Sequence, residues 1–186
     1  MGDKILPIFG YGHAVLKKAG NDIPEDFDGL SQLVDNMFAT MYNAQGVGLA
    51  GPQVGKSLRL FVVDTLQLDK EGDSGIKKAF INPEILEEKG GRWAYEEGCL
   101  SIPQVHGDVE RESEILIRYQ DVDRVWHEER YTDMDARVIQ HEYDHIEGVL
   151  FTEHLKPLRK RMVRRKLDKV RKGKVKVDYP IHFAQR

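Results

Sequence analysis

Hydrophobic residues recur at helical spacing in three segments of the chain. In the first segment, apolar side chains follow one another three or four positions apart, at Leu30, Leu33, Val34, Met37, Phe38 and Met41. That period places them on one face of an α-helix, which we expect to run from near Pro24 to just before Gly46. A second helix is predicted over 132–146, with Thr132 as its N-cap, Asp135 three residues later and Gly148 after its end.

The third helical segment, about 157–172, combines an apolar stripe with a high density of positive charge. The stripe consists of Leu158, Met162, Val163, Leu167 and Val170. From Lys156 to Lys176 the chain holds twelve Lys or Arg and one acid, whereas the rest holds the other 16 of 28 basic residues and 30 of 31 acidic ones. An acidic body with a basic C-terminal arm is typical of a protein that contacts a polyanion. The alternative is a solvated helix that merely carries these charges.

Short apolar runs between the helices predict β-strands. These runs are Leu60–Val63, Ala79–Asn82 ending at Pro83, Ile115–Tyr119 and Val125–Tyr131. The last two flank an Asp-rich turn and are predicted to form a hairpin, while Asp69–Gly75 is expected to be a polar loop. Short strands mixed with three helices, without regular βαβ alternation, predict one α+β domain over residues 1–186.

Composition narrows the class of protein. With 186 residues, 40% hydrophobic and 32% charged, the chain has room for one domain with its own core. No apolar stretch approaches the roughly 20 residues that span a bilayer, and Pro7 and Gly10 interrupt the start before a signal-peptide core forms. The sole cysteine, Cys99, cannot form an internal disulfide, which favours a reducing compartment. We therefore expect a cytoplasmic globular protein without a membrane partner.

The sequence His141-Glu-Tyr-Asp-His145 lies inside the second predicted helix. Residues four apart leave a helix on the same face, so both imidazoles can bind one metal ion while Glu142 reaches a water on it. Met134 and Val138 lie on the same face of the predicted helix as the two histidines. This apolar face predicts a largely buried, central helix. Buried histidines need partners, because an unsatisfied buried polar group costs about 1–3 kcal/mol. The alternative is a pair of surface histidines.

A third metal ligand is missing downstream of this motif. One class of zinc peptidase has a third His where this chain has Phe151, and another uses a later Glu, but no Glu follows Glu153. Upstream, Cys99 lies in Glu97-Gly-Cys-Leu-Ser101, and a thiolate is a strong ligand for ferrous iron or zinc. The alternative for a lone Cys is a small buried hydrophobic residue.

A glycine-rich stretch, Gly46-Val-Gly-Leu-Ala-Gly-Pro-Gln-Val-Gly55, follows the first predicted helix. It lacks the third glycine of a dinucleotide-binding fingerprint and the Gly-Lys-Ser/Thr ending of a phosphate-binding loop. Its backbone amides and the carboxamide of Gln53 are the parts of an oxyanion site or of a strand that docks a peptide. The alternative is an ordinary loop after a helix.

These three segments together resemble the signature motifs of the peptide deformylase family. GVGLAGPQ at 46–53, EGCLS at 97–101 and QHEYDHIEG at 140–148 occur in the family's order. The likeness includes Ile81-Asn-Pro83 and Leu155-Lys-Pro157 and covers nearly the whole chain. One departure is Gly51, where the family usually has alanine, and it removes no functional group. The resemblance implies an α+β fold in which antiparallel β-sheets surround a metal-bearing central helix, with a C-terminal helix.

The resemblance also implies a metallohydrolase that removes the N-terminal formyl group from formylmethionine of newly made proteins and releases formate. Its implied metal ligands are Cys99, His141 and His145, binding Fe²⁺ with Zn²⁺ or Ni²⁺ as replacements. Metal-hydroxide attacks the formyl carbonyl, with Glu142 as general base and then general acid. The Gln53 side chain and the Leu100 N–H stabilise the oxyanion, each such bond being worth about 3–4 kcal/mol.

The substrate of such an enzyme is an N-formylmethionyl nascent polypeptide, expected to add as a strand along Val47 and Gly48 with Gly98 opposite. Candidates for the methionine pocket are Val47, Tyr95, Met134 and Val138. The head of Arg137, beside them, is expected to point to solvent. The basic arm is predicted to dock on ribosomal RNA through phosphate contacts.

Two other classes of function are compatible with parts of the sequence. A zinc endopeptidase shares the helix motif, although Phe151 and the absent downstream Glu count against it. A non-catalytic, metal-stabilised RNA-binding module would explain the basic arm. It would leave Glu142 and the open coordination position unexplained.

Overall fold

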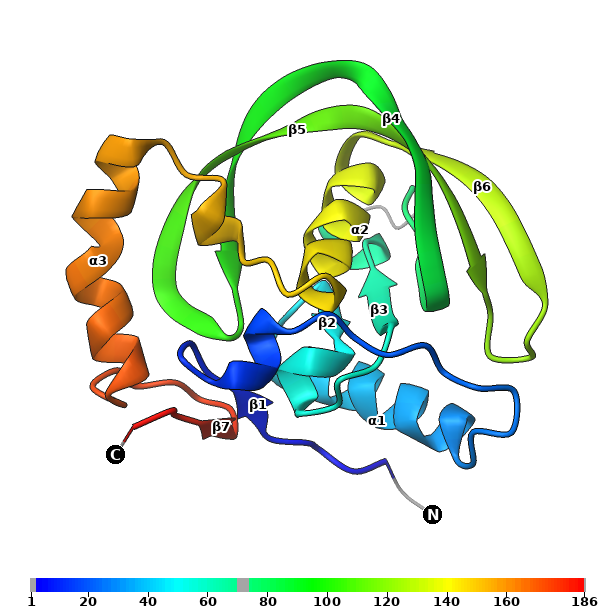
Figure 1. The fold of residues 1–186 in the computed structure, drawn as a ribbon, viewed down its shortest axis with the longest axis horizontal. Coiled ribbons are helices and arrows are strands. Elements are labelled where there is room, and N and C mark those ends of the chain that lie inside the picture. The colour runs from blue at the N-terminus through cyan, green and yellow to red at the C-terminus, as the bar shows by residue number, and fades with distance from the viewer. Residues whose placement is uncertain (1–2, 70–73, 186) are drawn as a thin grey trace.

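A strongly curved antiparallel sheet wraps around one helix, α2 (Figure 1). The computed structural model describes residues 3–69 and 74–185, and within them five strands pair in the order β2-β3-β4-β5-β6. Their bounds are Gly48–Ala50 for β2, Leu60–Asp64 for β3, Lys77–Cys99 for β4, Ile102–Gln120 for β5 and Trp126–Thr132 for β6. All four pairings are antiparallel, and the long strands β4 and β5 form most of the arch over α2.

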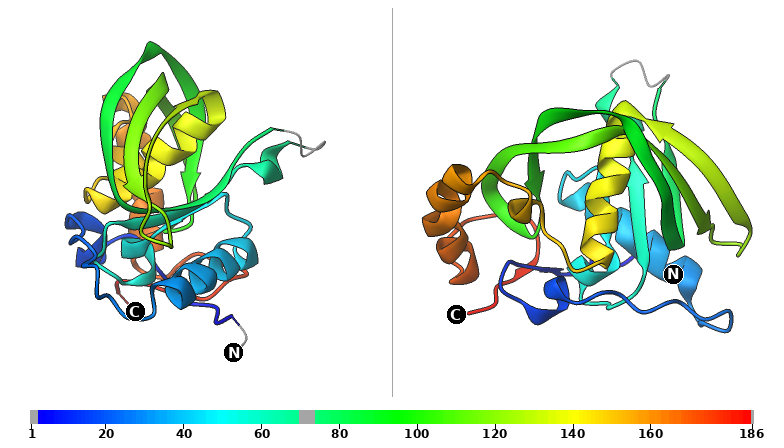
Figure 2. Two further views of the ribbon diagram at one scale, coloured as in Figure 1. Left: turned by 90° about the vertical axis from the view of Figure 1, so that its right-hand side faces the viewer. Right: turned by 45° about the horizontal axis from the view of Figure 1, so that its top comes forward.

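Three α-helices lie in the described part of the chain: α1 at Leu30–Asn43, α2 at Asp133–Ile146 and α3 at Pro157–Arg171. Short 3₁₀-helices occur at Ala14–Lys17, Gly51–Val54, Leu66–Leu68 and Phe151–Glu153. Figure 2 shows α2 inside the arch, α1 on the other side of the sheet and α3 at the periphery. The predicted α+β fold, with its central and C-terminal helices, is therefore confirmed. A small parallel pair, β1 (Ile8–Phe9) with β7 (Ile181–His182), joins the two ends of the chain.

Strand β3 lies between two hydrophobic clusters, which explains its continuous apolar run. Leu60 and Val62 pack with α1 residues such as Met37, while Phe61 and Val63 pack in the cluster that contains α2. All five residues of β3 are buried. Successive side chains of a strand point to opposite faces, so a strand covered on both sides is apolar throughout.

The first helix is shorter than predicted, since it begins at Leu30 rather than near Pro24. Gly29, the residue before it, has a φ of 74°. A residue in the left-handed backbone conformation cannot continue a right-handed helix, so the helix starts after this glycine. The apolar period from Leu30 to Met41 lies wholly inside the observed helix. The predicted upstream boundary was wrong because Phe27 continues the apolar period across Gly29, after which the helix begins.

Strand β4 continues through Pro83, where the sequence predicted an end. The register between β4 and β5 shifts between Ile81 and Glu84, and Asn82 has a φ of 49°. Pro83 therefore lies in a β-bulge. The strands are not paired by a hydrogen bond at this position, so the missing N–H of proline costs nothing. Strands β4 and β5 extend far beyond the predicted apolar runs. The outer part of β4 is largely exposed, and β5 alternates between buried and exposed residues, so neither part shows a continuous apolar run.

The other predicted elements differ in smaller ways. The β5–β6 hairpin is confirmed, and its turn lies at Asp121–Arg124. Thr132 is the N-cap of α2 but makes no side-chain cap bond, while Asp135 accepts a hydrogen bond from the Thr65 hydroxyl. The glycine-rich segment, for which an ordinary loop was the alternative, contains β2 and a 3₁₀-helix. Of the predicted loop 69–75, residues 70–73 lie outside the described residues.

Helix α3 uses only part of its apolar stripe for packing. Val163 and Val170 are buried, whereas Leu158 and Met162 are 72% and 61% exposed. The helix packs against the sheet mainly through β5, and two of the five stripe residues, Leu158 and Met162, face away from the body. No helix among the described residues is long and apolar enough to cross a membrane.

Candidate metal and catalytic site

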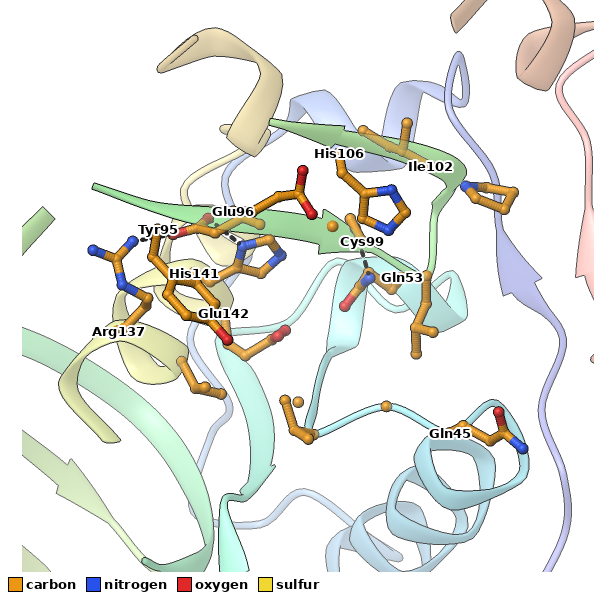
Figure 3. Close-up of a pocket in the computed structure, with 18 of the residues that line it drawn as sticks. Gln45, Gln53, Tyr95, Glu96, Cys99, Ile102, His106, Arg137, His141 and Glu142 are labelled. Atoms are coloured by element: carbon orange, nitrogen blue, oxygen red, sulfur yellow. Dashed lines mark hydrogen bonds and ion pairs between the residues drawn. The ribbon is translucent and has the colours of Figure 1, made fainter. Parts of the chain in front are cut away.

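Cys99, His141 and His145 converge at the centre of the arch. Their ligand atoms lie within 4.8 Å of one another, and Sγ of Cys99 is 3.3 Å from Nε2 of His145. The two histidines are one helical turn apart on α2, as their spacing predicts, and Cys99 is the last residue of β4. Figure 3 shows Cys99 and His141 at one side of a pocket, with Gln45 at the other.

An irregular hairpin end places Cys99 against α2. The pairing of β4 with β5 joins Gly98 to His106 but Cys99 to Ile102, so the register breaks beside the cysteine. Gly98 permits this geometry because a Cβ there would lie 2.6 Å from Cδ2 of His106. The end of β4 therefore leaves the regular pairing with β5 and places Cys99 beside α2.

The thiol and imidazole set has the chemistry of a metal site. Burial raises the pKa of the Cys99 thiol, but His145 and His141 outweigh this effect and lower the pKa to about 5. A thiolate with two imidazoles is a donor set that suits Zn²⁺ or Fe²⁺ and leaves a coordination position open. The residues present therefore fit a divalent metal ion.

Glu97 connects His141 to two buried arginines. Its Oε2 lies 2.9 Å from Nδ1 of His141, while its Oε1 accepts hydrogen bonds from Nε of Arg111 and Nη1 of Arg137, both at 2.7 Å. Burial raises the pKa of Glu97, but His141 and Arg111 lower it by more, so the carboxyl remains charged. A carboxylate at Nδ1 orients the ring and leaves Nε2 of His141 free for a metal.

Arg137 does not point to solvent, in contrast to the expectation from the sequence. Its side chain is 2% exposed, and its guanidinium donates to the carbonyls of Val109 and Trp93 at 3.1 and 2.7 Å. The same group lies 4.1 Å from the Trp93 ring centre and 5.6 Å from that of Tyr95. The signal that was missed is spacing, because Arg137 precedes His141 by four residues and therefore shares its inward face.

Glu142 lines the pocket, and one of its carboxylate oxygens has no hydrogen-bond partner in the described part of the chain. The residue is 4% exposed, and its Oε2 is buried with no hydrogen bond from any described residue. Burial raises its pKa to about 7, despite the neighbouring histidines. A buried carboxyl poised near neutrality, with one free oxygen, is suited to accept and release a proton.

The carboxamide of Gln53 points its NH₂ group toward the cysteine. Its Oε1 accepts the Ala50 N–H at 2.8 Å, which fixes the orientation of the amide. Its Nε2 then lies 3.4 Å from Sγ of Cys99 and 3.3 Å from Oγ of Ser101. This arrangement points the NH₂ group of Gln53 into the space that the Glu142 carboxyl also faces.

A pocket of about 450 Å³ opens beside these groups. Every residue predicted from the sequence to bind substrate or to form the methionine pocket lines it: Val47, Gly48, Tyr95, Gly98, Met134 and Val138. Leu100, Gln53 and Glu142 line it as well. The sequence did not point to several other lining residues, among them Gln104, His106 and Tyr179, because these lie outside the recognisable motifs.

Comparison with known proteins gives one consistent picture. Residues 5–161 match the family model described as polypeptide deformylase. The peptide deformylase of Christiangramia forsetii is 50% identical over 188 residues, covering 96% of each chain, and that of Cytophaga hutchinsonii is 50% identical over 179 residues, covering 96% of this chain and 97% of its own.

Solved structures agree with these sequence relatives. The crystal structure of a peptide deformylase from Legionella pneumophila superposes with a TM-score of 0.79 at 37% identity, over 91% of this chain and 97% of that one. That of the Thermotoga maritima enzyme has a TM-score of 0.75 at 38% identity, over 82% and 99%.

Proposed function

This chain belongs to the peptide deformylase family, hydrolases that remove the N-terminal formyl group from new proteins, and we propose that Cys99, His141 and His145 hold its metal ion. The observation that carries this assignment is their convergence within 4.8 Å beside the unpartnered carboxylate oxygen of Glu142. The proposed ion is Fe²⁺, with Zn²⁺ or Ni²⁺ as replacements, since one thiolate and two imidazoles accept all three. A divalent ion supplies a Lewis acid there, which makes water a stronger acid.

Glu142 is the proposed proton carrier of the reaction. Its free Oε2 accepts a proton from the attacking water and later delivers it to the amine nitrogen as the C–N bond breaks and formate leaves. Two features support this role: burial raises its pKa to about 7, and no described residue occupies that oxygen. The charge that develops on the formyl oxygen is stabilised by the Gln53 carboxamide and the Leu100 N–H, which both line the pocket.

The substrate peptide is proposed to bind as an added strand between Val47–Gly48 and Gly98. Strand β2, which begins at Gly48, is an edge of the sheet, so one side of it is open to a partner strand. Gly98 lines the same pocket from β4. Main-chain recognition of this kind ignores side-chain identity, which suits an enzyme that acts on many proteins.

The basic arm is proposed to contact ribosomal RNA in the cytoplasm, where new polypeptides emerge. Arg161, Arg164 and Arg165 of α3 are exposed, and no described residue forms an ion pair with them. Free cations on one helix can neutralise phosphates, and such binding weakens steeply with salt. The exposed Leu158 and Met162 lie on the same helix.

Formate release from a formyl-Met-Ala-Ser peptide tests the catalytic assignment. The protein is purified without oxygen and assayed beside Glu142→Gln, with an acetylated peptide as substrate control. We expect formate from the wild type only, with all peptide bonds intact and equal metal content in both proteins. Cleaved peptide bonds would indicate an endopeptidase. A Glu142→Gln variant with more than about a tenth of wild-type turnover would contradict the assigned proton carrier.

A further inference from the structure

The segment that follows α3 returns to the mouth of the catalytic pocket. It is anchored by the β1–β7 pair and by the Ile8 N–H, which donates to the Pro180 carbonyl at 2.9 Å. A second anchor is Gln104, whose Nε2 donates to the Lys176 carbonyl at 3.0 Å. This tail lies beyond the residues that match the family model, which end at 161. Its contribution to the site therefore has to be argued from this structure.

Tyr179 is the residue of the tail that enters the site. Its side chain is half-buried, packs against the hydrophobic cluster that contains α1, and lines the pocket together with Cys99 and Glu142. Its hydroxyl donates a hydrogen bond of 2.7 Å to the carbonyl of Leu100. Leu100 directly follows the proposed metal ligand Cys99.

The turn that holds Leu100 needs support from outside the hairpin. Leu100 and Ser101 alone connect β4 to β5. Two-residue hairpin turns that match the twist of the strands require at least one residue with positive φ. Neither Leu100 nor Ser101 is among the described non-glycine residues that have a positive φ. The strand pairing next to the turn is also broken, between Gly98 and Cys99.

Three contacts from distant segments supply that support. The Tyr179 hydroxyl binds the Leu100 carbonyl, the Tyr11 N–H donates to the Ser101 carbonyl at 2.8 Å, and the Gln53 carboxamide reaches Oγ of Ser101 at 3.3 Å. Of these, the Tyr179 bond is the one made to Leu100 itself. It restrains the peptide group between Leu100 and Ser101, which directly follows the peptide group that carries the Leu100 N–H.

We propose that Tyr179 is a positioning residue for deformylation, which holds the Leu100 backbone so that its N–H meets the oxyanion that forms in the pocket. This inference rests on the proposed function. A donor that acts only as charge develops lowers the barrier without tightening substrate binding. Loss of the Tyr179 hydroxyl should therefore lower kcat and leave KM and the metal unchanged. A merely structural tyrosine would instead affect stability, metal content or both.

The test compares Tyr179→Phe with wild type and with Tyr11→Phe. Both variants lose one phenol oxygen and keep the ring. Tyr11 contacts the turn only through its backbone N–H, which the substitution retains, and its hydroxyl makes no hydrogen bond within the described part of the chain. Measurements are kcat and KM for formate release, metal content per chain and the midpoint of thermal unfolding. For Tyr179→Phe we expect kcat to fall about tenfold, with KM within about twofold of wild type and unchanged metal content. Tyr11→Phe should match wild type.

Other results would overturn the inference. A kcat for Tyr179→Phe within about twofold of wild type would show that the hydroxyl does not position Leu100. A loss of rate that only follows loss of metal or of thermal stability would assign Tyr179 a structural role. Absence of formate release by the metal-loaded wild type would instead contradict the proposed function, so the two failures are distinguishable.

Discussion

The carboxyl group of Glu142 lies in the space that a side chain at Gly48 would occupy. A Cβ built on Gly48 would be 2.8 Å from both Cγ and Cδ of Glu142. Gly48 is not among the glycines with positive φ, so its backbone conformation is open to any residue. The glycine is therefore required by the Glu142 side chain that packs on it and not by the geometry of its own strand.

Gly48→Ala should consequently damage catalysis more than folding. The added methyl forces the Glu142 carboxyl away from its position, and misplacement of a catalytic group by about 1 Å can cost a hundredfold in rate. We expect kcat for formate release to fall at least tenfold, with a change in unfolding free energy of about 1 kcal/mol.

Gly107→Ala is the matched control for this substitution. A Cβ there would be 2.6 Å from Cδ2 of Leu155, a flexible side chain away from the pocket. It should lower stability with little effect on kcat. Equal loss of kcat in the two variants would contradict the steric role of Gly48.

Glu97→Gln should weaken both metal binding and the fold. The change removes the carboxylate that orients His141, and such supporting partners typically contribute 10- to 100-fold to metal affinity. It also removes the shared counter-charge of Arg111 and Arg137, and breaking a buried pair costs about 3–5 kcal/mol. Competition with a chelator and urea denaturation measure the two effects.

Glu96→Gln is its control, since Glu96 is exposed and adjacent but contacts neither arginine in any described ion pair. Wild-type metal affinity in Glu97→Gln would show that the carboxylate does not position His141 for a metal.

Acid should remove a stabilising contribution from Glu129. Burial raises its pKa, but Lys78, Tyr131 and Tyr119 outweigh this effect and lower it from the ordinary 4.5 to about 2. A depressed folded pKa stabilises the protein above the unfolded pKa, and that contribution fades as the pH falls toward the folded value. The difference in unfolding free energy between wild type and Glu129→Gln should therefore shrink between about pH 5 and pH 2.

Urea denaturation at several pH values measures this difference, and Glu128→Gln, a neighbouring exposed residue, serves as control. If the difference in unfolding free energy between wild type and Glu129→Gln stays constant as the pH falls, the ion pair between Lys78 and Glu129, at 2.6 Å, does not cause it.

Reversal of charge on α3 should weaken ribosome binding. The variant combines Arg161→Glu, Arg164→Glu and Arg165→Glu. If these side chains neutralise phosphates, affinity should fall at least tenfold in the variant. The slope of log affinity against log salt should also decrease by about one for each phosphate that is no longer neutralised. Co-sedimentation with ribosomes at several salt concentrations measures both quantities.

A control with the same net charge reverses Lys4, Lys18 and Lys56, which are exposed and lie outside α3. If both triple variants weaken binding equally, the effect is one of total charge and α3 is not a docking surface. Neither variant should change the kcat of formate release from a short peptide.

The pattern of the sequence predicts local structure well where a single element decides the geometry. The four-residue spacing of His141 and His145 sets their common face, and the helix that bears them differs from its prediction by one residue. The apolar period of 30–41 likewise lies inside α1. Elements without a continuous apolar run were missed or shortened, such as the outer part of β5 and the course of β4 through Pro83. There, bulges and alternating polar positions replace the simple pattern.

The sequence by itself determined the three motifs, the donors they carry and, through their likeness to a family, the reaction. Only the tertiary structure decided which side chains support those donors: Glu97 with its two arginines, Gly48 against Glu142, and Tyr179 on Leu100. The physical reason is that periodicity specifies the face of one helix or strand. Contacts between segments as distant as Leu100 and Tyr179 depend on strand register, sheet curvature and the path of the C-terminal tail. None of these is encoded in local spacing.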